Sequence, residues 1–328
     1  MPTYDAKPPL AFADLPYQGL DGKPWPVSRA DVADVRKRYK LGKNVRVAYV
    51  DLHQNGGRTL VFLHGLGSYL KFWRYQLDTF ARGGYRVLAI DMLGYGKSDK
   101  PATFPYTMES MVDVVRSLLR QLDVKDPILV GHSMGGQIAL SYAIRYPKEV
   151  SALVLTAPAG FEEFGSGERR WLTRVFTVPL VAGASEYDIW GSVRYNNFYN
   201  WDDEYNWLIE ERVRLAKNPE FASYAYANVK SVRGLANNDF VRKNLGKVKA
   251  PTLIVHGDRD RLIPNPFMHG GTTRSIMEYG HENIRGSTLV TLEGCGHMVQ
   301  MDCSAEYNAT VRGFLRRRSA LDRRVSNR

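Results

Sequence analysis

Short apolar runs recur along the chain, and the stretches between them are long enough for a helix. Six of these runs are the clearest: Thr59–Leu63, Tyr85–Ile90, Pro127–Val130, Ala152–Leu155, Thr252–Val255 and Thr288–Leu292. Short, nearly continuous apolar runs are typical of parallel strands that are covered on both faces. Between the second and third runs, Met108–Leu122 has apolar residues at helical spacing. The alternation predicts an α/β fold class, with a mostly parallel central sheet flanked by helices.

One long segment interrupts this alternation. Residues 161–237 contain no strand-like run, yet they hold 15 of the 38 Phe, Trp and Tyr residues. We interpret the segment as a helical cap inserted between two strands of the sheet. The predicted core is then formed by residues 45–160 and 238–317.

The two ends of the chain differ from this core. Residues 1–44 are rich in proline, which resists regular structure, and we expect an extended arm that wraps the body or stays loose. Residues 318–328 form a basic tail. We favour the interpretation that the arginines from Arg312 onward belong to a solvated helix end, near the negative pole of the helix dipole. The alternative is a weak contact with an anionic membrane. Nucleic acid is not expected as a partner, because Phe314 alone interleaves the arginines.

Composition narrows the class of protein. The chain has 328 residues, 44% of them hydrophobic and 24% charged, which is typical of a globular protein. No apolar stretch reaches the roughly 18–20 residues that span a bilayer. No secretory signal is recognisable at the start, so a cytoplasmic location is expected. The net charge of +11 favours anionic partners.

The two cysteines, Cys295 and Cys303, are too few for a disulfide framework and form no metal-binding CxxC pair. We therefore expect no metal site, and we expect Cys295 to be a small buried hydrophobic residue.

The run from Gly131 to Gly136, Gly-His-Ser-Met-Gly-Gly, is the strongest chemical motif. It follows a predicted strand and precedes a predicted helix. A serine at such a sharp turn has a strained backbone and an exposed hydroxyl, and small residues two places on either side permit the turn. We predict that Ser133 is a nucleophile.

A serine hydroxyl needs a base, and the base needs an acid. Among seven histidines, His297 lies on a glycine-flanked loop after the last predicted strand, whereas His132 is expected to point away from the turn. Asp258 and Asp260 both follow the strand that ends at Val255. Asp260 fits better a loop that turns back toward the histidine, and Asp258 is expected to hold the turn or pair with an arginine.

An oxyanion needs backbone N–H donors. Met134, the residue after the nucleophile, supplies one. The turn His64–Gly67 follows an earlier strand and is expected to supply the other through Leu66, with His64 bracing the loop. The alternative is a glycine turn without a role in catalysis. It does not explain why the turn follows the strand at which the second N–H donor is expected.

These motifs together resemble the α/β-hydrolase superfamily over roughly residues 46–315. They stand in the family's order: His64–Gly67, Asp91–Ser98, Gly131–Gly135, Gly257–Pro264 and Gly296–His297. The resemblance implies Ser133 as nucleophile, Asp260 as acid and His297 as base, with no cofactor. A dinucleotide cofactor is excluded because the GxGxxG spacing is missing.

Several branches of the superfamily, which catalyse related reactions, are compatible with these motifs. Relatives that cleave carbon–carbon bonds often carry Trp after the base, where this chain has Met298, and the serine elbow is similar to esterases and monoacylglycerol lipase-like members. We therefore expect hydrolysis of a small-molecule ester with an apolar acyl or aryl group. Gly65, Tyr199, Trp201 and Met298 are the expected substrate-binding residues. The alternatives are a C–C hydrolase, a thioesterase, a lactonase, a cofactor-free perhydrolase or a non-enzymatic ligand receptor.

Overall fold

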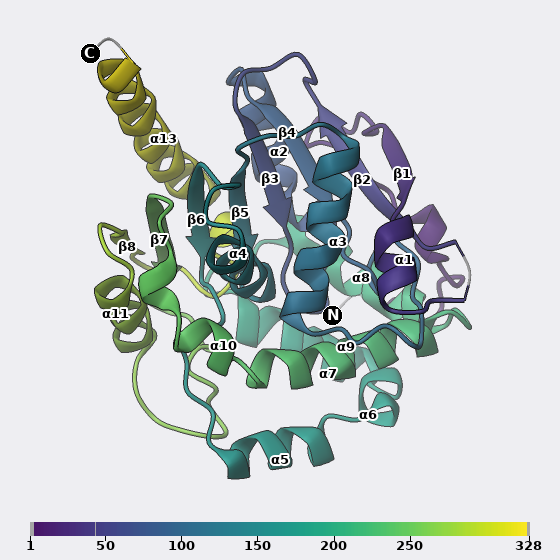
Figure 1. Cartoon of the computed structure of the whole chain (residues 1–328). Coiled ribbons are helices and arrows are strands. Elements are labelled where there is room, and N and C mark those ends of the chain that lie inside the picture. The colour runs from purple at the N-terminus through teal and green to yellow at the C-terminus, as the bar shows by residue number, and fades with distance from the viewer. Residues whose placement is uncertain (1–2, 43, 327–328) are drawn as a thin grey trace.

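A computed structural model describes residues 3–42 and 44–326; for residues 318–326 it describes the backbone only. Its centre is one eight-stranded sheet with the strand order β1-β2-β4-β3-β5-β6-β7-β8 (Figure 1). The strands are β1 (Val27–Asp31), β2 (Arg46–Leu52), β3 (Thr59–Leu63), β4 (Arg86–Ile90), β5 (Ile128–His132), β6 (Ala152–Thr156), β7 (Thr252–Gly257) and β8 (Thr288–Leu292). From β4 to β8 the neighbouring strands pair in parallel, whereas β2 pairs antiparallel with both β1 and β4.

All six predicted strands are present, with bounds within two residues of those expected. Every residue of β3, β5, β6 and β7 is buried. This burial explains the continuous apolar runs, because helices cover both faces of the sheet. Helices α3 (Met108–Gln121) and α4 (Met134–Arg145) lie on one face, and α2 (Arg74–Arg82) and the start of α13 (Ser304–Ser326) lie on the other (Figure 1).

The prediction that residues 1–44 lie outside the core is wrong. Residues 27–31 form β1, an edge strand of the sheet, and α1 (Ala33–Arg38) follows it. The strand was missed because an edge strand has one unpaired side, and β1 is only partly buried and lacks a continuous apolar run. Further upstream, residues 4–10 do wrap the body.

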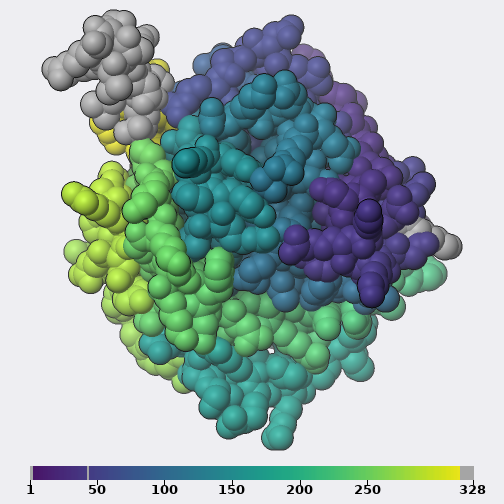
Figure 2. Space-filling view, viewed as in Figure 1, coloured from purple at the N-terminus to yellow at the C-terminus, as the bar shows by residue number. Residues whose placement is uncertain are grey.

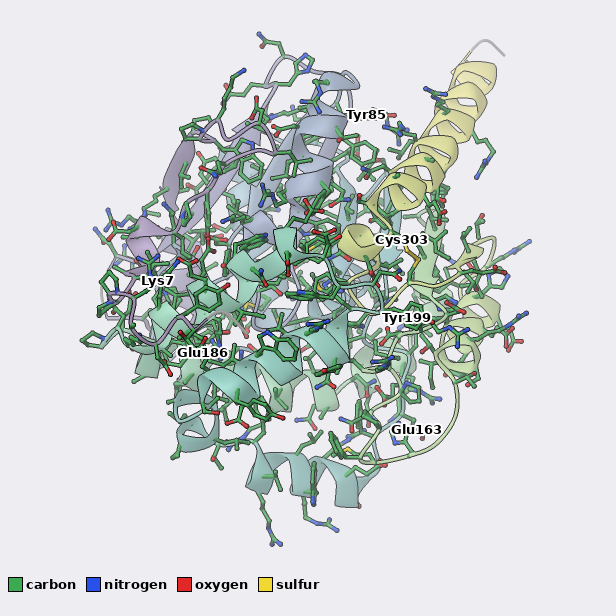
Figure 3. All side chains as sticks on the ribbon, turned by 180° about the vertical axis from the view of Figure 1, so that it is seen from behind. Lys7, Tyr85, Glu163, Glu186, Tyr199 and Cys303 are labelled. Carbon is green, nitrogen blue, oxygen red and sulfur yellow. A yellow bond between two sulfur atoms is a disulfide. The ribbon has the colours of Figure 1, made fainter. Side chains whose placement is uncertain are left out.

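Residues 4–10 act as a strap across two helices, α7 (Glu186–Gly191) and α8 (Asn206–Ala216). The Tyr4 amide donates to Glu186, and the Lys7 ammonium pairs with Glu210, each at 2.7 Å. The Leu10 amide donates to the carbonyl of Arg214. Figure 3 shows Lys7 and Glu186 on the same side of the molecule.

Between β6 and β7 the described chain forms helices and no strand. They are α5 (Ser166–Val175), α6 (Val178–Ala182), α7, α8, α9 (Phe221–Ala236) and α10 (Asp239–Arg242), together with short turns of 3-10 and π helix. They gather at one end of the sheet, with α5 and α6 outermost (Figure 1). The basic segment at the other end is not a separate tail, because α13 continues through it to Ser326; residues 327–328 lie outside the described part.

Two shorter helices complete the core. They are α11 (Thr273–Asn283), which packs on β7 and β8, and α12 (Val299–Asp302), which directly precedes α13. Among the helices of the described residues, none combines the length and hydrophobicity that crossing a lipid bilayer requires.

Candidate active site

Ser133 stands at a strained turn between β5 and α4. Its backbone has φ 51° and ψ −114°, an unusual conformation for a residue with a side chain. The turn is tight because its glycines approach other backbone closely. A Cβ on Gly131 would lie 2.3 Å from the Gly135 carbonyl oxygen, and one on Gly135 would lie 2.2 Å from the Leu63 carbonyl oxygen. The turn therefore requires glycine at both positions.

The structure brings His297 and Asp260 together. His297 Nδ1 lies 2.8 Å from Asp260 Oδ2, and both side chains are almost fully buried. The other carboxylate oxygen of Asp260 accepts from the amides of Leu262 and Ile263, at 2.8 and 3.1 Å. With each oxygen engaged, the carboxylate holds the imidazole by Nδ1, so the second ring nitrogen, Nε2, is turned away from the acid.

Asp258 takes a different position. Its carboxylate accepts from the Gly294 amide at 2.7 Å and pairs with Arg259 at 3.2 Å. It thereby holds the turn that leads into the His297 loop, and it makes no contact with His297 among the interactions of the described residues.

The serine turn and the histidine loop meet through His132. Its ring lies 4.8 Å from the ring of His297, and its Nε2 lies 3.1 Å from the His297 carbonyl oxygen. Burial and the neighbouring histidine hold the pKa of His132 well below its usual range, so its ring stays neutral. This places His297 next to the residue that precedes Ser133.

The turn after β3 lies against the serine. A Cβ on Gly65 would contact the His132 ring at 2.7 Å and the Cβ of Ser133 at 3.4 Å. Within the described chain, no group accepts a hydrogen bond from the backbone N–H of Leu66 or of Met134. The two unengaged N–H groups thus belong to the residue that follows Ser133 and to the residue that follows Gly65.

His64 braces this turn. Its Nε2 accepts a hydrogen bond from the Met92 amide at 3.1 Å, and its Nδ1 lies 2.8 Å from the Gly65 carbonyl oxygen. An acceptor at Nε2 and a donor at Nδ1 together define a neutral tautomer. In agreement, burial lowers the pKa of His64 to about 4.

Cys295 is buried as expected, but the expectation of a free side chain is wrong, because Cys295 and Cys303 form a disulfide (Figure 3). The short helix α12 reverses the chain and brings the two Cα atoms to 6.0 Å, a normal separation for a disulfide. The bond closes a loop that contains His297 and Met298. Sequence spacing alone does not reveal such a reversal.

Asp302 is a second anchor of this loop, and sequence reasoning missed it. Its carboxylate accepts from the Gly296 amide at 2.6 Å and from the amides of Tyr199 and Asn200 at 2.8 and 2.9 Å. The segment around Tyr199 is therefore fixed against the loop that carries His297. Tyr199 and Asn200 lie 103 and 102 residues from Asp302 in sequence, so no local pattern indicates this contact.

Of the expected substrate-binding residues, Gly65 lies beside Ser133 as described, and the others belong to the helical segment or its contacts. Met298 is buried in an apolar cluster with Phe198 and Tyr205. Trp201 packs on the same two rings, at centroid distances of 5.3 and 5.7 Å. The Tyr199 ring is half exposed and lies under the guanidinium of Arg259. Substrate contact by these side chains stays a prediction.

A buried ion pair also escaped sequence reasoning. Lys71, just after the turn that carries Leu66, lies 2.5 Å from Glu211 of α8, and both side chains are buried. The Tyr69 hydroxyl donates to the other oxygen of Glu211. The pair joins the loop beside the candidate site to the helical segment.

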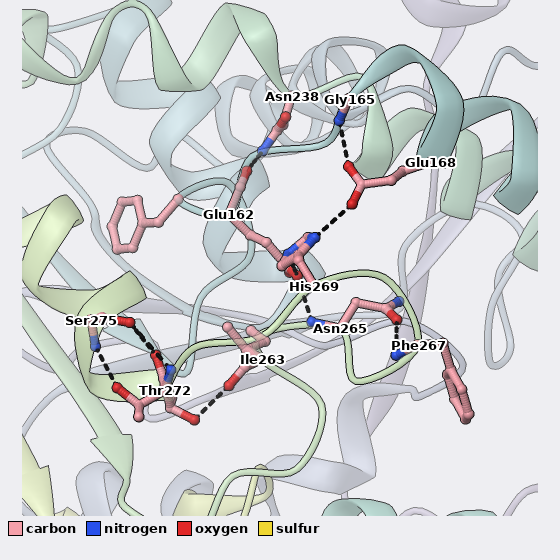
Figure 4. Close-up of polar contacts among 12 residues, drawn as sticks. Glu162, Gly165, Glu168, Asn238, Ile263, Asn265, Phe267, His269, Thr272 and Ser275 are labelled. Carbon is pink, nitrogen blue, oxygen red and sulfur yellow. Dashed lines mark hydrogen bonds and ion pairs between the residues drawn. The ribbon is translucent and has the colours of Figure 1, made fainter.

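A histidine between two glutamates makes a similar connection on the outer side (Figure 4). His269 Nε2 lies 2.6 Å from Glu162 and Nδ1 lies 2.8 Å from Glu168, at the start of α5. Burial lowers the pKa of His269, but hydrogen bonding to Glu168 and the charge of Glu162 outweigh it and raise that pKa. The His269 ring thus links the loop that follows Asp260 to α5.

Comparison with known proteins agrees with this geometry. Residues 58–303 match the family described as alpha/beta hydrolase fold, and the chain belongs to that family. It is a hydrolase of this family.

Two curated relatives each match more than four fifths of the chain. The chain is 29% identical over 274 residues to the uncharacterized hydrolase YugF of Bacillus subtilis (strain 168), covering 82% of this chain and 93% of the relative. It is 30% identical over 287 residues to a 2-hydroxymuconate semialdehyde hydrolase of Pseudomonas sp. (strain CF600), covering 84% and 94%.

Solved structures are similar as well. A probable hydrolytic enzyme from Pseudomonas aeruginosa PAO1 superposes with a TM-score of 0.80 at 23% identity, covering 93% of this chain and 97% of that one. An esterase from Exiguobacterium antarcticum superposes with a TM-score of 0.69 at 25% identity, covering 83% and 96%.

Proposed function

We propose that this protein is a serine hydrolase that cleaves carboxylic esters through an acyl-enzyme intermediate. The observation that carries the proposal is the buried Asp260–His297 pair beside the strained Ser133 turn. In this family, a serine, an acid and a histidine in this chain order act together in acyl transfer.

The proposed mechanism uses the groups in a fixed sequence. Ser133 Oγ attacks the ester carbonyl carbon while His297 Nε2 takes the hydroxyl proton. The Leu66 and Met134 N–H groups stabilise the negative oxygen of the tetrahedral intermediate. His297 then donates its proton to the departing alcohol, and the carbon–oxygen bond to that alcohol breaks. Water repeats the cycle on the acyl-enzyme. Asp260 keeps the imidazole oriented and stabilises its charged form. The mechanism requires no cofactor.

The apolar character of the surroundings favours an apolar acyl or aryl group. Leu66 packs against a cluster formed by Leu172, Val232 and Ala236. We therefore expect the acyl part to lie along these side chains, within the hydrophobic segment between β6 and β7.

Substitution of Trp201 and Tyr199 tests whether their rings contact the substrate. Replacing each in turn by alanine is expected to change the preference for ester chain length, because their segment is fixed to the His297 loop by Asp302. An unchanged preference in both variants would contradict a role of these rings in substrate binding.

A C–C bond hydrolase is the second candidate, because a relative of 30% identity is named a 2-hydroxymuconate semialdehyde hydrolase. Met298 at the position after the base argues for the ester. A panel that offers both p-nitrophenyl esters and a ring-fission product distinguishes the two candidates.

The primary experiment measures hydrolysis of p-nitrophenyl esters from acetate to palmitate. Turnover that peaks at one chain length and disappears in Ser133→Ala supports the proposal. Ser141→Ala is the matched control, since Ser141 lies on α4, the helix that follows Ser133, and has a buried hydroxyl without a partner in the described structure. Labelling by a fluorophosphonate should follow the same pattern. A folded wild-type protein without ester turnover or labelling would refute the proposal.

A further inference from the structure

The two outermost helices each bury only one side. On α5, Leu172 packs against Val232 and Ala236 of α9. On α6, Val181 packs against Ala225 and Val229 of the same helix. Because α5 and α6 both rest on α9, their opposite sides point away from the body of the protein (Figure 1).

The outward sides carry large apolar side chains. Trp171 and Val175 of α5 are 45% and 43% exposed, and Leu180 of α6 is 52% exposed. Trp171 and Val175 are four residues apart, so they form a stripe along the helix. We refer to these three side chains as the outer apolar stripe. Figure 2 shows α5 in teal at the lower edge of the molecule, where no other segment covers it.

A basic stripe runs beside the apolar one. Arg170 and Arg174 are exposed, are also four residues apart, and have no ion-pair or hydrogen-bond partner in the described structure. From Arg169 to Ser185 there are three arginines and no Asp or Glu. An exposed Trp and aliphatic side chains next to unpaired arginines are characteristic of helices that lie on lipid.

A hollow between α5 and α9 adds a place for an anionic group. It has a volume of about 280 Å³, and its lining consists of Arg169, Arg170, Thr173, Arg174, Arg233, Ala236 and Asn237. Arg169 already pairs with Asp239, and Arg233 donates to the carbonyl of Thr173, whereas the buried Nε atom of each arginine lacks a partner. Guanidinium groups match phosphate oxygens in geometry and charge.

We propose that α5 and α6 form a docking surface for an anionic lipid bilayer. The outer apolar stripe enters the interface between headgroups and acyl chains, and Arg170 and Arg174 contact lipid phosphates, one of which occupies the hollow. Charge complementarity selects this partner, because an uncharged bilayer would leave the arginines unpaired while an anionic one engages them.

The docking surface lies close to the candidate active site. The cluster of Leu172, Val232 and Ala236 behind α5 is packed against Leu66, the residue that carries one of the proposed oxyanion donors. An ester carried by the bilayer would thus meet the protein on the side of the site. This statement about the substrate rests on the proposed function, whereas the docking does not.

The basic end of α13 cannot share a bilayer with α5. It projects from the opposite side of the molecule from α5 (Figure 1), so one flat bilayer does not reach both. Arg316 and Arg317, exposed residues on α13, therefore provide a matched control with the same change of charge.

Cosedimentation with vesicles tests the docking. Wild-type protein is expected to bind vesicles of equimolar phosphatidylcholine and phosphatidylglycerol and not vesicles of phosphatidylcholine alone. Arg170→Glu/Arg174→Glu and Trp171→Ser/Leu180→Ser are each expected to reduce binding by at least about tenfold. Arg316→Glu/Arg317→Glu should leave it within about twofold. No binding to anionic vesicles, or binding that depends on Arg316 and Arg317 and not on α5 and α6, would overturn the proposal.

Hydrolysis of a soluble ester tests the proposed function independently of vesicle binding. All three variants should hydrolyse p-nitrophenyl acetate like wild type, which also shows that they are folded. Vesicle binding without any ester turnover would refute the proposed function and leave the docking intact. Ester turnover without vesicle binding would refute the docking and leave the proposed function intact.

Discussion

The buried pair of Lys71 and Glu211 allows a quantitative prediction. Its atoms are 2.5 Å apart, and the two side chains are only 3% and 6% exposed. The Lys71 ammonium also lies 4.1 Å from the centre of the Trp207 ring. The pair joins the loop after the Leu66 turn to α8, so its loss should loosen the helical segment from the core.

Coulomb attraction and desolvation nearly cancel in the intact pair. At 2.5 Å and an effective dielectric constant of about 20, the attraction is about 7 kcal/mol. Removing two ions from water costs several kcal/mol for each of them. The pair therefore contributes little net stability, but removing one partner leaves an uncompensated buried charge. Lys71→Met should lower the free energy of unfolding by about 3–5 kcal/mol.

Protonation limits this loss, because burial already raises the pKa of Glu211. Glu211→Gln should cost a similar amount, since it leaves the Lys71 ammonium buried without a countercharge. The double variant Lys71→Met/Glu211→Gln keeps an acceptor for Tyr69 and should recover most of the loss. Because the double variant then costs less than either single variant, the coupling energy between the two positions should exceed about 3 kcal/mol.

Chemical denaturation followed by circular dichroism measures these free energies. Lys7→Met is the matched control, because the Lys7–Glu210 pair joins the same helix α8 but its side chains are 46% and 25% exposed. Its loss should cost less than about 1 kcal/mol. If each buried substitution also costs less than about 1 kcal/mol, or if the two effects simply add, the reasoning is refuted.

Three further predictions concern the candidate site. Asp260→Asn should lower kcat by about 10⁴-fold with a smaller change in KM, because the histidine then loses its tautomer and its countercharge; steady-state kinetics on a p-nitrophenyl ester measure this. Cys295→Ser/Cys303→Ser should lower the free energy of unfolding by about 2–3 kcal/mol, as expected for a short closed loop, and should lower kcat because His297 lies in that loop; denaturation and kinetics check both. Burial lowers the pKa of His64 to about 4, below its unfolded value of about 6.5, so the unfolded state binds more protons between these values. The stability from neutral His64 is thus present above pH 6.5 and lost as the pH falls to 4, and His64→Gln should flatten the stability profile over that range.

Each of these predictions has a control. Asp258→Asn should reduce kcat far less than Asp260→Asn, since Asp258 contacts the Gly294 amide and not His297; equal losses would contradict the assignment of the acid. For the cysteines, a stability and kcat equal to wild type would show that the disulfide does not position the loop. For His64, identical pH profiles of variant and wild type would show that its burial does not govern acid stability.

Most of the strands that the sequence predicted have a uniform environment, although the edge strand β8 is only partly buried. Strands β3 and β5–β7 are buried on both faces, so their residues are apolar throughout and stand out. Strand β1 lies at the edge with mixed exposure, and its polar residues concealed it. Ser133 was predictable because the strained turn imposes glycines on its neighbours, which leaves a local pattern.

The remaining features depend on contacts between distant positions. Asp302 binds amides about a hundred residues away, and Glu211 pairs with Lys71 across 140 residues. Nothing near either acid in sequence marks these partners. The disulfide joins cysteines only eight residues apart, yet it depends on the reversal made by α12, which spacing does not encode.

The strap of residues 4–10 has a consequence for how the protein is made. Tyr4 binds Glu186 and Lys7 binds Glu210, partners that lie 182 and 203 residues further along the chain. At typical translation speeds, roughly 10–40 s pass between the synthesis of one side of these contacts and the other. Residues 4–10 therefore reach their final places late, whereas β1 can pair with β2 early. A nascent chain that stops before α8 would leave Lys7 and Leu10 without their partners Glu210 and Arg214, so closure of the strap requires α8.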